Sequence, residues 1–183
     1  MALVDRVKNI LLTPKTEWSA IAGETATVQG LYTGYIMILA AIGPIALALR
    51  FGIAGMGLGV ALVSYVIALL MTFVLAWIVD ALAPSFGGEK NLERSLQLVA
   101  YSFTAAWVAG IFHLVPFVGS LLSLAGSIYS LYLFWLGAPV MRKCAPDKAT
   151  RFTVVVVLCA IVAGAILSYL MFSLGGFGTM GMT

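Results

Sequence analysis

The chain has 183 residues, of which 62% are hydrophobic and only 9% are charged. A soluble domain typically has about 25% charged and 45–50% apolar residues. The composition therefore excludes an ordinary water-soluble fold, and lipid is the expected solvent for much of the chain. The net charge of +3 comes from cations scattered between apolar runs, which excludes a nucleic-acid-binding surface. We expect one membrane domain over residues 1–183.

Two short helices are predicted before the first long apolar run, within residues 1–29. The apolar residues of the first helix share one face, whereas Asp5, Arg6, Lys8 and Asn9 fall elsewhere. The residues of that face are Leu3, Val4, Val7, Ile10 and Leu11. Thr13 followed by Pro14 is typical of the start of a second helix. The residues that share one side of that second helix are Trp18, Ile21 and Ala22. Either these are interfacial helices on the cytoplasmic leaflet, or they pack under the bundle.

Five long apolar runs follow, and we expect no cleavable signal peptide before them. They cover residues 30–49, 57–79, 95–115, 117–138 and 152–174. Each has about 20 residues or more, enough for a helix to cross a hydrocarbon core of about 30 Å. The runs lack the alternation of barrel strands. The sequence thus predicts an all-α integral membrane protein, a five-transmembrane-helix bundle with short N-terminal interfacial helices.

The distribution of cations predicts how the chain is oriented. Nine of the ten Lys and Arg residues fall before the first run or in the second-to-third and fourth-to-fifth connections, and Arg50 alone falls on the other side. Cytoplasmic loops retain cations. We therefore expect the N-terminus in the cytoplasm and the C-terminus outside. An even number of spans would break this segregation.

Proline and small residues predict how the spans meet. Pro116 separates the third run from the fourth with almost no loop, which indicates a tight outer hairpin or a re-entrant pair. Pro44 predicts a kink in the first span. Small residues recur at helical spacing, which is typical of close packing within the chain or of a homo-oligomer interface. Among them are Ala68, Thr72 and Ala76, Gly110, and Gly119.

One candidate ligand site emerges at the cytoplasmic side. Asp80 closes the second span, and an acid near a membrane core is costly and often functional. Pairing with Lys90 or Arg94 is the structural alternative. Tyr101 and Tyr132 are predicted at a similar depth, where aromatic side chains commonly form an interfacial belt. The sharper hypothesis is a polar and aromatic cavity for a lipid headgroup, with Asp80, Tyr101 and Tyr132 around its mouth.

Residues that would support catalysis, a metal ion or a cofactor are scarce. The chain holds one histidine, His113, and two cysteines, Cys144 and Cys159, without metal-ligand spacing. Residues Pro84–Asn91 lack the spacing of a phosphate-binding loop. We therefore expect no enzyme activity, no catalytic residues, no metal site and no cofactor.

Several short motifs, in order along most of the chain, carry a family resemblance. They are Arg6–Pro14, Gly30–Tyr35, Asp80–Gly88, Leu98–Ser102, Leu114–Gly119, Tyr129–Leu133 and Gly137–Val140. Together they resemble the bacterial branch of the Yip family, which is named for members that associate with Ypt/Rab GTPases. The resemblance implies a five-span helical membrane domain without catalytic residues, in a bacterial cytoplasmic (inner) membrane.

Two functional hypotheses from different classes follow. The first is a non-enzymatic scaffold or adaptor that organises membrane lipid or recruits another membrane or cytoplasmic protein at the cytoplasmic face. The alternative is a lipid or small-molecule translocator with an inward-facing polar and aromatic cavity. Against the alternative, no predicted span carries a charged residue at mid-depth. The expected partners are membrane lipids, a second protein or a second copy of the chain, and no nucleic acid.

Overall fold

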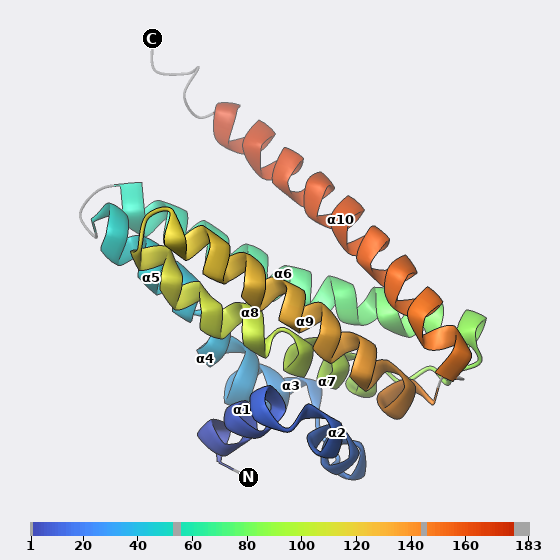
Figure 1. Cartoon of the computed structure of the whole chain (residues 1–183). Helices are drawn as coiled ribbons and strands as arrows, with labels where there is room; N and C mark the ends of the chain where they lie inside the picture. The colour runs from blue at the N-terminus through green and yellow to red at the C-terminus, as the bar shows by residue number, and fades with distance from the viewer. Residues whose placement is uncertain (1, 53–55, 144–145, 178–183) are drawn as a thin grey trace.

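The chain folds into a bundle of helices in a computed structural model that describes residues 2–52, 56–143 and 146–177 (Figure 1). The helices are α1 (Leu3–Leu12), α2 (Pro14–Gly23), α3 (Val28–Leu31), η1 (Tyr32–Ile36), α4 (Met37–Ala40), α5 (Ile42–Phe51), α6 (Met56–Leu82), η2 (Ala83–Phe86), α7 (Leu92–Ser102), α8 (Thr104–Ala109), η3 (Gly110–Leu114), α9 (Val118–Arg142) and α10 (Pro146–Phe177). No strand occurs in these three ranges, so the predicted all-α fold is confirmed.

Five stretches are long and apolar enough to cross a membrane, which confirms the predicted number. They are Val28–Phe51, Gly57–Phe86, Leu92–Leu114, Val118–Arg142 and Lys148–Leu167. The third begins at Leu92, ahead of the uncharged run from 95. The reason is local, because the Asn91 side chain accepts a hydrogen bond from the Arg94 amide at 2.9 Å and caps the helix. Charged residues thus occupy the first helical turn.

The first span is interrupted twice. Residues Tyr32–Ile36 form a π-helical turn, and the helix breaks again at Ala41 before α5 begins at Ile42. Pro44 has no amide hydrogen to donate to the preceding turn. The break at Ala41 lies about one turn before Pro44, at the place where the sequence predicts a kink.

The third and fourth spans form a tight antiparallel hairpin. The turn between them is closed by the Gly119 amide, which donates to the Val115 carbonyl at 3.1 Å. Arms of 23 and 25 residues make each side long enough to cross. The hairpin also packs closely against the first span at Gly110, because a Cβ on Gly110 would lie 2.9 Å from the Gly43 Cα atom. Gly110, one of the predicted small residues, therefore marks packing within the chain.

The fifth span packs differently from the others. α10 contacts α6 and α9 near its beginning, where Phe152 is fully buried, and then leans away from the bundle (Figure 1). Most of its later apolar side chains, such as Ile161 and Tyr169, are not covered by the other helices. Only 11% of this apolar stretch is buried by the protein, against 67% of the third span. Lipid is the natural solvent for this face.

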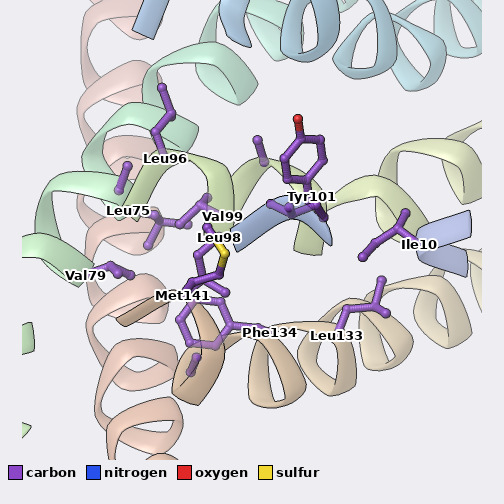
Figure 2. Close-up of a cluster of buried hydrophobic side chains, with 14 of the residues drawn as sticks. Ile10, Leu75, Val79, Leu96, Leu98, Val99, Tyr101, Leu133, Phe134 and Met141 are labelled. Carbon is purple, nitrogen blue, oxygen red and sulfur yellow. The ribbon is translucent and has the colours of Figure 1, made fainter. Parts of the chain in front are cut away.

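The N-terminal helices α1 and α2 lie across one end of the bundle (Figure 1). Their side chains Ile10, Trp18 and Ile21 are fully buried. They join a cluster that includes Leu98, Phe134 and Met141, which lie close together in Figure 2. Of the two interpretations that the sequence leaves open, packing under the bundle is the one observed. We call α1 and α2, residues Leu3–Gly23, the platform.

Gly137 allows the platform to dock on α9. A Cβ atom there would lie 2.6 Å from the ring of Trp18 and 2.7 Å from Leu98 Cδ1. We expect Gly137→Ala to lower the free energy of unfolding by about 1–3 kcal/mol, because an extra methyl group overpacks this contact. Unfolding in mixed detergent micelles measures the change.

The matched control is Gly59→Ala, since a Cβ atom there meets nothing within 4 Å. This variant gains helix propensity in α6 and should be neutral or more stable. Equal stability of the Gly137→Ala and Gly59→Ala proteins would contradict the docking that is described here.

Candidate functional site

A buried arginine connects the two helices of the platform to the bundle. Arg6 is only 4% exposed, and its guanidinium group pairs with Glu17 and Glu24. The same group lies 5.5 Å from the ring centroid of Tyr101, a geometry that suits a cation–π contact. The sequence pattern predicts that Arg6 lies away from the packed face of α1, and this prediction is wrong. Two acids and an aromatic ring supply the partners that a buried cation needs.

The electrostatics of Arg6 favour its charged form. Burial alone disfavours the charge, but hydrogen bonding to Glu24 and the attraction of Tyr101, Glu24 and Glu17 outweigh it. The net result is a pKa of Arg6 above its usual value. Arg6 thereby ties α1 to α2, since Glu17 lies in α2 and Glu24 follows it.

Two further contacts hold the platform beneath the spans. The hydroxyl group of Tyr129, in α9, donates a hydrogen bond to the Leu11 carbonyl at 2.8 Å. This carbonyl belongs to the last turn of α1, whose final acceptors have no partner within the helix. Trp18 packs edge-on against Tyr101 at a centroid distance of 6.5 Å. The platform is therefore fixed by charge, by hydrogen bonding and by aromatic packing.

A second buried arginine closes the same end of the bundle. Arg142, 2% exposed at the end of α9, donates from Nη2 to Asp80 Oδ1 at 3.2 Å. It also donates to the carbonyl of Asn91 at 2.7 Å and to that of Glu89. Asp80 Oδ1 in turn accepts from the Asn91 amide at 2.6 Å. Arg142 thus fixes the connection between the second and third spans.

These contacts correct the partner that the sequence suggested for Asp80. Lys90 and Arg94 are nearer in the chain, but Arg142 is the residue that pairs with Asp80. Arg94 instead donates to the Ile21 carbonyl at the end of α2, at a long 3.4 Å. Asp80 therefore has a structural role, because it neutralises the charge of Arg142 and accepts a hydrogen bond from the Asn91 amide.

The structure places the other two predicted site residues in different surroundings. Tyr101 is 7% exposed and lines a cavity of about 190 Å³ together with Arg6, Glu24 and Tyr35. Tyr132 is 40% exposed on α9 and lines a separate, open cavity of about 530 Å³ beside Thr13–Thr16. Neither cavity is lined by Asp80. The common mouth that the sequence suggests therefore lacks support from this geometry, and ligand binding by the three residues stays a prediction.

The residues that sequence reasoning missed are the two buried arginines and their acidic partners. A helical pattern places Arg6 beside other charged residues and gives no sign of burial. The available signal was the pair of acids, Glu17 and Glu24, in a short segment with little other charge. For Arg142, the signal was its position at the end of an otherwise uncharged run.

The part of the chain that the structure describes contains no set of side chains that would bind a metal ion. No three His, Cys, Asp or Glu side chains gather there into a group that would hold a metal ion. Glu17 and Glu24 are instead paired with Arg6, and Asp80 is paired with Arg142. These ion pairs hold the platform and the connection between the second and third spans in place.

Removing one partner of Arg6 tests its role. We expect Glu17→Gln to lower the free energy of unfolding by about 3–5 kcal/mol, because it leaves a buried cation poorly compensated. It should also raise amide hydrogen exchange across α1 and α2. The control is Glu93→Gln, an exposed acid in the first turn of α7. Similar changes in both variants would overturn the assignment.

The pairing of Asp80 makes an independent prediction. Asp80→Asn should cost about 1–3 kcal/mol of unfolding free energy, because Arg142 loses its carboxylate. Lys90→Gln should stay within about 0.5 kcal/mol, as a surface substitution. If Lys90→Gln proves the more damaging of the two, the pairing with Arg142 is wrong.

Comparison with known proteins agrees with this architecture. Neither the curated proteins nor the solved structures contain a match to the chain. The Yip1 domain, however, matches residues 8–178, which include all five spans and most of the platform. The chain is therefore a polytopic membrane protein that belongs to the Yip1 domain family.

Proposed function

We propose that the chain is a non-enzymatic membrane adaptor whose platform recruits a protein partner at the cytoplasmic face. The observation that carries this proposal is the buried Arg6 network. It ties α1 and α2 together beneath the spans. Ordering a surface in advance reduces the entropy that a partner must lose on binding.

The charge distribution supports a cytoplasmic position for the platform. The platform, the beginnings of α7 and α10 and the end of α9 lie at one end of the bundle (Figure 1). All of these segments carry Lys or Arg, whereas Arg50 belongs to α5 at the opposite end. Cations near span ends remain on the cytoplasmic side. The same distribution supports an external C-terminus.

The outer face of α1 offers contact residues. Val4, which the sequence pattern wrongly places on the apolar face of the helix, is 71% exposed. Leu12 is 69% exposed, and the exposed charges of Asp5 and Lys8 lie between them. Apolar side chains framed by charges are typical of a transient protein-binding surface. A second copy of the chain is an alternative occupant. Translocation, the other hypothesis, has less support because Tyr101 and Tyr132 line different cavities.

Site-specific photo-crosslinking in native membranes tests the adaptor role. A photoreactive residue at Val4 and one at Leu12 should trap the same protein, and Glu17→Gln should reduce that product because the platform loosens. The same probe at Lys148, an exposed site on α10, is the control. Identical products from all three positions, or none from α1, would contradict the proposal. A product of twice the chain mass would identify a homo-oligomer.

A further inference from the structure

A basic cavity lies where the platform meets the ends of two spans. Its volume is about 300 Å³, and its wall combines α2, the connection before α7, the first turn of α7 and the end of α9. The basic side chains in the wall are Arg94, Arg142 and Lys143, and Glu89 is the acid. Apolar residues complete it, namely Ala22, Val140 and Met141.

The depth of this cavity matches the phosphate layer of a bilayer. α9 has 25 residues, about 37 Å of helix at 1.5 Å per residue, whereas the hydrocarbon core is about 30 Å thick. A wall built from the last residues of α9 therefore lies at headgroup level. Val140, 39% exposed, gives this wall an apolar surface beside the charged groups.

The cationic side chains of the cavity differ in how strongly they are paired with other groups of the protein. Arg142 neutralises Asp80 and binds the carbonyls of the adjoining connection. The Arg94 guanidinium group makes only the long hydrogen bond to the Ile21 carbonyl among the described residues. Lys143 lies 3.6 Å from Glu89, but both side chains are more than three-quarters exposed. Such exposed pairs contribute little, so Arg94 and Lys143 are available to an anion.

The backbone conformation at Lys143 is also unusual for a lysine. Lys143 has a φ of +52° and a ψ of +26°, the left-handed conformation that usually selects glycine at a helix end. A lysine there is strained, and strain of this kind concentrates at functional sites. The negative end of α9 and the positive beginning of α7 border the same cavity and oppose each other. The side-chain cations therefore decide which ligand the cavity prefers.

We propose that this cavity binds the phosphate group of an anionic phospholipid, with Arg94 and Lys143 as the ligand-binding cations. The phosphate accepts hydrogen bonds from the guanidinium and ammonium groups, and the glycerol end of the lipid lies against Val140. This site is independent of the protein partner proposed above, because Val4 and Leu12 do not line it.

Native mass spectrometry of the full chain in mild detergent, titrated with phosphatidylglycerol, tests the site. Lys143→Gly removes the ammonium group and also relieves the left-handed strain, so its fold should be at least as stable. Arg94→Gln removes the other cation. Each variant should bind the first lipid about fivefold more weakly, since a cation near a headgroup contributes about 1 kcal/mol.

The control is Lys148→Gln, which removes an exposed cation at the same end of the bundle but outside the cavity wall. It should change lipid affinity by less than about twofold. Equal affinities in all variants would overturn the site. Diacylglycerol, which lacks phosphate, should not compete, and its competition would overturn the role of phosphate. Equal displacement of the lipid by free glycerol phosphate would move the assignment from a lipid to a soluble phosphate compound.

Discussion

The buried ion pairs of Arg6 are the interaction on which the rest of this end of the molecule depends. Moving a cation out of water costs several kcal/mol, and attraction to Glu17 and Glu24 offsets that cost only when all three groups hold their positions. The network therefore favours one arrangement of α1 and α2 over others. That arrangement then buries Trp18 against α9 and allows Tyr129 to reach the end of α1.

A second buried arginine fixes the adjoining connection between the second and third spans. Arg142, at the end of the fourth span, binds Asp80 and the carbonyl of Asn91, just before the third span. Both arginines lie at the end of the bundle where water is near, while the spans themselves pack through small residues and apolar contacts. The buried ion pairs of the described residues are thus gathered at the α1–α2 end of the bundle. α10 packs against the bundle only near its beginning.

Most of the fold could be predicted from the sequence because lipid imposes a simple rule: long uncharged stretches must be helices. Pro44 and Gly110 added correct local detail. The charged contacts could not be predicted, since periodicity alone does not distinguish a buried Arg6 from an exposed one. Nor does proximity in the chain identify a partner across helices, as Asp80 and Arg142 show. Tyr101 and Tyr132 were expected at a similar depth, but depth does not fix the direction of a side chain.

The measurement that tests the central claim most directly is the distance between spin labels on the platform and on a span, in lipid nanodiscs. Labels at Val4, on α1, and at Glu93, on α7, occupy exposed positions and leave the buried network intact. A platform fixed by Arg6 predicts one narrow distance distribution, unchanged between detergent and lipid. A broad distribution, or two populations in lipid, would show that α1 moves freely and would contradict the account.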